Sequence, residues 1–151
     1  MALRPDRNEH LTDLSFFMNE TAERGGIVVA STQASGAAMD DSTAAVKFPT
    51  ALTDRPVGLL LNDVVNLDLT RQHINYAKDE VQKGSKVLVL RVGTVVTDQI
   101  SGAITMGDAA HFGIDNGKLQ SATADSTSIV VGRWLSKKDA DGYAKVAINI
   151  V

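Results

Sequence analysis

One stretch of this sequence, residues 84–117, limits what the chain can fold into more than any other. It contains an unbroken apolar run, Val87 to Leu90, that is too short for an ordinary helix. Glycine then recurs at short intervals, and Gly93 inside a helix would cost about 1 kcal/mol relative to alanine. The glycines after the run are Gly93, Gly102, Gly107, Gly113 and Gly117. This pattern predicts short central β-strands joined by tight turns.

The rest of the chain repeats this alternation of short apolar segments and polar turns. Asp115-Asn116-Gly117 predicts a hairpin turn, because Asn-Gly supplies the two positive φ angles of a type I′ turn. Residues 136–142 predict a polar turn that ends at Gly142. Further strands are predicted over residues 27–30, 44–48, 57–61, 64–69, 129–135 and 144–150. Residues 70–83 are polar, and we interpret them as an excursion from the sheet with room for a helical turn.

The spacing of these segments predicts an all-β fold, a small β-barrel or β-sandwich with an extended N-terminal arm. The last predicted strand alternates and places Val146, Ile148 and Ile150 on one face. On its other face it places Lys145, Ala147 and Asn149. We expect Trp134 and the three residues of the first face to share one core.

Length and composition exclude several classes of protein. A chain of 151 residues fits one domain that can bury a sizeable core. The absence of cysteine excludes disulfides and thiolate metal sites. A net charge of −3 argues against nucleic acid as a partner. No apolar run approaches the ~20 residues of a membrane-spanning helix, so we expect no membrane partner either.

Residues 1–24 differ in character from residues 25–151, and we predict an N-terminal arm followed by a β-rich domain. The arm mixes charges with a compact apolar group, Leu11, Leu14, Phe16, Phe17 and Met18. Four of these fall at helical spacing, which indicates a short helical turn. Two interpretations stay open: the group docks on its own domain, or it reaches a neighbouring subunit. Exposed apolar clusters of this kind usually mark a contact, and an arm of that kind would be separable from the folded domain.

The candidates for chemistry have simpler explanations as structure. His10, His73 and His111 share no metal-binding spacing. Asp139-Ala140-Asp141-Gly142 lacks the remaining ligands of a calcium loop and indicates a turn. Asp40 and Asp41 lie in a small-residue loop, where we expect them to be solvated. We therefore expect no catalytic residue, no metal and no cofactor, and we do not expect an enzyme.

A resemblance narrows the function. The chain over about residues 24–151 resembles the head decoration (cement) proteins of tailed bacteriophages. The resemblance rests on the order of short motifs, beginning with Arg24-Gly25-Gly26 and including Arg55-Pro56-Val57-Gly58, Gly107-Asp108 and Val131-Gly132-Arg133-Trp134. It implies a structural virion protein, made in the host cytoplasm, that forms a homotrimer on the outer surface of the capsid.

In that role the partner is the major capsid protein, and the chain bridges neighbouring capsid subunits. The arm is then a strap, with Leu11, Leu14, Phe16, Phe17 and Met18 as its contact residues. Fold alone does not establish function, so other classes stay open. A phage tail or baseplate structural protein has the same character, and a trimeric β-barrel enzyme has a similar size. A carbohydrate-binding sandwich would need more aromatic residues than one Trp and two Tyr supply.

Overall fold

The computed structural model describes residues 3–4, 7–33, 36, 44–64, 67–68, 73–74, 79–121 and 129–151. These residues form strands, turns and loops without an α-helix, so the prediction of an all-β fold is confirmed. Within this described part, no helix exists that could span a membrane. The main strands are β1 (Asn8–Met18), β3 (Ile27–Ser31), β4 (Ala45–Lys47), β5 (Pro56–Asp63), β9 (Lys86–Thr97), β10 (Ala109–Phe112), β11 (Leu119–Gln120), β12 (Val130–Trp134) and β13 (Ala144–Asn149). Two small ribbons pair β2 (Ala22–Glu23) with β8 (Glu80–Val81) and β6 (Leu67–Asp68) with β7 (His73–Ile74).

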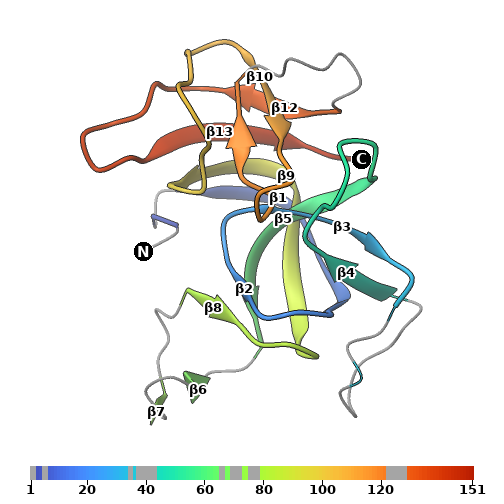
Figure 1. Cartoon of the computed structure of the whole chain (residues 1–151). Coiled ribbons are helices and arrows are strands. Elements are labelled where there is room, and N and C mark those ends of the chain that lie inside the picture. The colour runs from blue at the N-terminus through green and yellow to red at the C-terminus, as the bar shows by residue number, and fades with distance from the viewer. Residues whose placement is uncertain are drawn as a thin grey trace.

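The nine main strands form one mixed sheet that closes partly on itself. Their order is β1-β4-β3-β5-β9-β13-β12-β10-β11, and β1 also pairs with β9. The strands β1, β4, β3, β5 and β9 therefore make a closed ring, in which only the β1–β4 pair is parallel. The second half of β9 leaves the ring and continues the sheet through β13, β12, β10 and β11 (Figure 1).

Two hydrophobic cores follow from this arrangement. The ring core lies inside the closed ring and contains Met18, Val46, Val28, Leu60 and Val89, one from each strand of the ring. The upper core lies between the ring and the β10–β13 strands and contains Leu59, Leu61 and Leu90 together with side chains of those strands. Strands β3, β5 and β9 thus face a core on both sides, which explains why their sequences are continuous apolar runs and do not alternate.

The upper core confirms the expected burial of the last strand. Trp134, Val146 and Ile148 are buried there, and Ile150 packs against them partly buried. The Asn-Gly turn is also confirmed, because Asn116 and Gly117 have φ of 49° and 66° and Lys118 N–H donates to the Asp115 carbonyl at 3.0 Å. The polar turn between β12 and β13 is present, with Gly142 at φ 89°.

Several expectations need correction or lie outside the described residues. Gly93 does not end a short strand; it lies inside the 12-residue strand β9. In the predicted strand 64–69 only Leu67 and Asp68 are described as strand. Half of the segment 70–83, the place of the predicted helical turn, lies outside the described residues, and its described residues include the short strands β7 and β8 and no helix. Asp40 and Asp41 lie outside them as well. The boundary at residue 24 stays a prediction, although residues 8–18 form a strand of the main sheet.

Gly93 is required where β9 passes from the closed ring to its pairing with β13. It pairs with Glu9 on one side and Ile148 on the other, so three strands meet at this residue. Its φ is 154°, and a Cβ added there would lie 2.3 Å from the carbonyl oxygen of Asn8. The missing side chain therefore allows β1 to approach β9 closely.

Gly93→Ala is expected to destabilise the protein by about 1–3 kcal/mol, through backbone strain and the contact with Asn8. Gly102→Ala is the matched control, because Gly102 also has positive φ, 76°, but a Cβ there meets open space. Chemical denaturation of both variants measures the difference. Equal losses for the two variants would contradict the close approach of β1.

Candidate interaction surface

The apolar group of the N-terminal segment is divided by strand β1 between the core and the surface. Leu11 and Leu14 are 44% and 43% exposed. Met18 is fully buried in the ring core, and Phe16 packs against that core partly buried. Phe17, the residue between them, points the other way, and the Lys86 ammonium lies 6.0 Å from its ring centroid. Only the two leucines are therefore strongly exposed.

The predicted helical turn in this segment is wrong, because residues 8–17 pair with β9 as an antiparallel strand. The pairing is irregular, with register shifts after Glu9, Leu11 and Asp13. At the last shift Asp13 is paired with Val89 and Phe16 with Val87. Leu14 and Ser15 on β1 therefore lie opposite the single residue Leu88 on β9. This bulge brings Leu14 out of the regular ladder.

The side chain of Asp13 stabilises the bulge. Its Oδ1 accepts a hydrogen bond from the Ser15 N–H at 2.9 Å and a second one from the Ser15 hydroxyl. These hydrogen bonds lower the pKa of Asp13, and the positive charge of Arg91 acts in the same direction. The two hydrogen bonds between Asp13 and Ser15 therefore support the backbone of the bulge.

Leu11 lies on an open sheet face formed by β1, β9 and β13. It is paired with Val92, and Val92 is paired with Asn149 on the next strand. Asn8, Thr94, Ala147 and Arg133 form a parallel row across β1, β9, β13 and β12.

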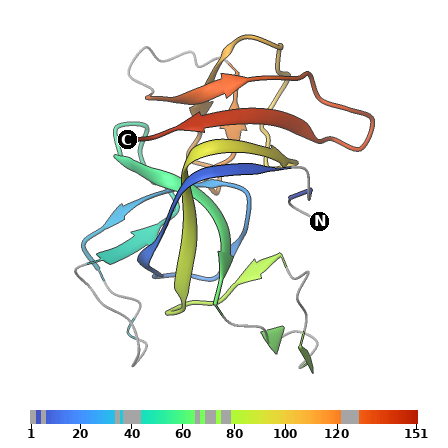
Figure 2. The ribbon, with the colours of Figure 1, turned by 180° about the vertical axis from the view of Figure 1, so that it is seen from behind.

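These rows lie on the face of β13 opposite to its core residues. Figure 2 shows β1, β9 and β13 side by side in the foreground with no described strand in front of them. We call this surface the outer sheet face and define it by Asn8, Leu11, Val92, Thr94, Arg133, Lys145, Ala147 and Asn149.

The outer sheet face has the composition of a contact surface. Its centre is made of small or apolar side chains, Val92, Thr94 and Ala147, each partly exposed. Its margin carries Arg133, Lys145 and Asn149, which are exposed. An apolar centre with a polar rim is the usual anatomy of a protein–protein interface.

Two surface pockets lie among the described residues, and the second of them shares Lys145 with the outer sheet face. The first, of about 330 Å³, includes Glu23 and Asp98 among its lining residues. Desolvation raises the pKa of Glu23, and the nearby charges of Asp98 and Asp79 raise it further. Within the described part of the chain, no group of three or more His, Asp or Glu side chains is arranged to hold a metal ion.

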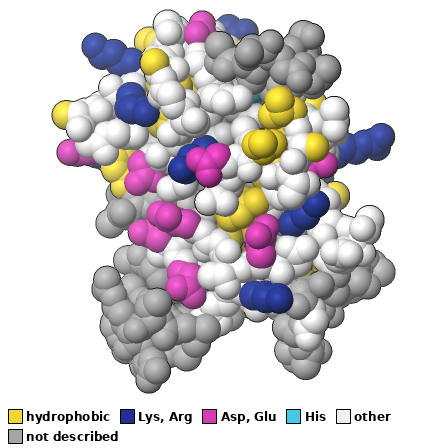
Figure 3. All heavy atoms as spheres, viewed as in Figure 1, with side chains coloured by type: hydrophobic (Ala, Val, Ile, Leu, Met, Phe, Trp, Pro, Cys, Tyr) yellow, Lys and Arg dark blue, Asp and Glu magenta, His cyan; other side chains and the backbone are white. Residues whose placement is uncertain are grey.

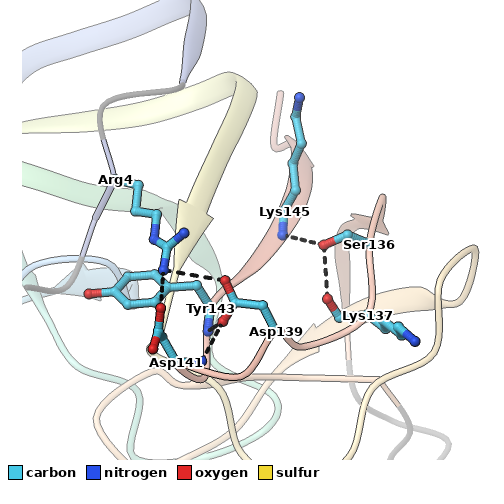
Figure 4. Close-up of polar contacts among 7 residues, drawn as sticks. All are labelled: Arg4, Ser136, Lys137, Asp139, Asp141, Tyr143 and Lys145. Carbon is cyan, nitrogen blue, oxygen red and sulfur yellow. Dashed lines mark hydrogen bonds and ion pairs between the residues drawn. The ribbon is translucent and has the colours of Figure 1, made fainter.

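The second pocket, of about 340 Å³, lies at the β12–β13 hairpin, and its lining includes four cationic side chains. Its lining includes Arg4, Lys137, Lys138, Lys145 and Tyr143. The predicted turn at Asp139 is confirmed, because Asp139 Oδ1 accepts hydrogen bonds from the N–H groups of Asp141 at 3.0 Å and Tyr143 at 2.8 Å. The carboxylate is thus used inside the turn, as Figure 4 shows.

On the face of the molecule shown in Figure 3, acidic and basic side chains are both present.

The sequence identified Leu11 and Leu14 as candidate contact residues but not their neighbours on β9, since strand pairing cannot be seen in the sequence. The alternation of the last strand did separate Lys145, Ala147 and Asn149 from the core residues. Nothing in the sequence indicated a role for Arg4.

Comparison with known proteins adds one finding to this geometry. A protein-family model described as XM1 gp53 minor capsid protein matches residues 6–150. None of the curated proteins matches the chain. The match includes β1 as well as every later strand.

Proposed function

Because this chain belongs to the XM1 gp53 minor capsid protein family, we propose that it binds the outer surface of a phage capsid and stabilises the shell by bridging neighbouring major capsid subunits. Membership in the family makes it a phage structural virion protein. The proposal adds the decoration role, the outer location, the major capsid protein as partner and a homotrimeric state.

The observation that carries this proposal is the outer sheet face, which includes the exposed Leu11, together with the exposed Leu14 on the same strand. A bridging protein needs broad surfaces that touch several subunits, because linked contacts raise avidity without any single strong site. Leu11 and Leu14 supply apolar area on one strand, and the flat rows of small side chains on β9 and β13 continue it. Each leucine is about half exposed, so each has area left to bury in a complex.

The double variant Leu11→Ser/Leu14→Ser is expected to bind capsids roughly thirtyfold more weakly, because two losses of about 1 kcal/mol add. Each half-exposed leucine would contribute on the order of 1 kcal/mol on burial, and about 1.4 kcal/mol is tenfold in affinity. The melting temperature should change little, because both side chains already contact water. Co-sedimentation with capsids that lack this chain measures retention. Cryo-electron microscopy of the wild-type complex should show added density on the outer surface across subunit boundaries.

Ile114→Ser is the matched control, since Ile114 is 58% exposed on the β10–β11 turn, away from β1. It should leave retention unchanged. Equal retention of the double variant and the wild type would remove the leucines from the contact. Density at the tail or inside the shell would contradict the decoration role and would assign the protein to another part of the virion.

A further inference from the structure

Arg4 joins the start of the chain to the hairpin near its end. Its side chain forms ion pairs with Asp141 at 3.0 Å and Asp139 at 3.3 Å. The guanidinium carbon lies 4.3 Å from the centroid of the Tyr143 ring. Figure 4 shows the Arg4 side chain next to this ring and the two carboxylates. The two partner carboxylates and the ring all belong to the β12–β13 hairpin and its junction with β13.

The backbone beside Arg4 is held as well. The Arg4 N–H donates to the Val96 carbonyl at 3.0 Å, and Leu3 forms an isolated bridge with Thr97. Leu3 is only 2% exposed and belongs to the upper core. Residues 3 and 4 therefore anchor the beginning of the chain at the end of β9.

One of the two receiving carboxylates, Asp139, is held in place by its own turn. Asp139 Oδ1 accepts hydrogen bonds from two N–H groups of its own turn, which leaves Oδ2 for Arg4. Desolvation raises the pKa of Tyr143 above its ordinary value, with nearby carboxylates acting in the same direction and the charge of Arg4 opposing them. The guanidinium therefore stacks on a neutral phenol ring. A preorganised acceptor costs less to dock onto than a flexible one.

Between this anchor and the buried end of β1, the chain is held by backbone pairing with β9 and not by buried side chains. In residues 8–14 every side chain except Asp13 is exposed, and the register shifts there interrupt the ladder with β9. The next firm anchor is at Phe16 and Met18 in the ring core. A segment with few buried contacts opens locally at lower free energy than the core does. We call residues 8–14 the strap.

We propose that Arg4 is a releasable clasp that holds the strap on the sheet, and that its opening frees the strap for the capsid. The Arg4 side chain is 36% exposed, and its partners Asp139 and Asp141 are 42% and 76% exposed. Ion pairs this exposed are weak and are screened by salt. Release takes Asn8 and Leu11 off the outer sheet face, presents Leu11 and Leu14 on a flexible segment, and uncovers the edge of β9. The part of that face on β9, β13 and β12 stays in place. This inference rests on the proposed function, since the capsid is the partner that uses the freed strap.

The test is hydrogen exchange on the isolated protein, read by mass spectrometry or NMR. Arg4→Gln is expected to speed exchange of the amides in residues 8–13 about five- to tenfold, while the amides of residues 16–18 stay unchanged. The double variant Asp139→Asn/Asp141→Asn should reproduce the effect. In the wild type, 0.5 M salt should produce part of it.

Lys138→Gln is the matched control, because it removes a cation from the same hairpin without a contact to Arg4; its ammonium donates to the Gly102 carbonyl. Unchanged exchange in the strap of Arg4→Gln would overturn the clasp. Faster exchange spread equally over β9 and β13 would also overturn it, as a general loss of stability.

The second readout is the rate of association with capsids. If the strap must open before the protein binds, Arg4→Gln should associate with capsids faster by about the factor seen in exchange. The reason is that a larger fraction of the molecules has an open strap and can bind. Faster exchange with an unchanged association rate would show that Arg4 holds the strap but that opening of the strap is not needed for capsid binding. Absence of capsid binding by every variant and the wild type would instead contradict the proposed function, and the exchange result would stand separately.

Discussion

A chain that lacks residues 1–20 is expected not to form the native sheet at all. The truncation removes β1, which pairs with β9 from Asn8 to Phe17 and closes the ring against β4. It also removes Met18, which is fully buried in the ring core, and Leu3, which is buried in the upper core. Replacing one such side chain by alanine costs about 2–5 kcal/mol, and whole domains are stable by only about 5–15 kcal/mol.

Circular dichroism and a thermal melt of the truncated chain measure this directly. Removal of Val151, which is 93% exposed, is the control and should leave the melt unchanged. The amino-acid sequence alone favoured the opposite result, a separable arm. A cooperative melt of the truncated chain close to that of the full chain would restore that interpretation.

Ile148→Ala is expected to cost about 2–5 kcal/mol, toward the upper end of this range. Ile148 is 2% exposed in the upper core, and it is paired with Gly93 on β9 and with Gly132 on β12. Neither neighbour has a side chain that can move into the cavity, so the site cannot collapse easily. The size of the loss depends on how far the surroundings relax.

Chemical denaturation gives the change in the free energy of unfolding. Ile148→Val should lose only about 0.5–1.5 kcal/mol, because it removes one methylene. Asn149→Ala, on the exposed side of the same strand, should be nearly neutral. A loss below about 0.5 kcal/mol for Ile148→Ala would show that β13 turns its other face to the core.

The amino-acid sequence determined the all-β fold and much of the core, because those depend on local pattern. Continuous apolar runs at 27–30, 59–61 and 87–90 belong to strands that face a core on both sides. Strict alternation at the end of the chain assigned β13 its buried face. The turn at Asn116-Gly117 follows from the backbone freedom of those two residues.

The tertiary structure alone decided what the N-terminal segment does. The spacing of Leu11, Leu14, Phe17 and Met18 fits a helix, and it fits a bulged strand equally well. The choice depends on hydrogen-bonding groups along β9, which lies about 75 residues further on in the chain and whose edge no local pattern reveals. The clasp between Arg4 and the β12–β13 hairpin depends in the same way on two ends of the chain meeting. Such contacts arise only when the whole sheet has formed, because the groups that make them are separate in sequence and adjacent only in space.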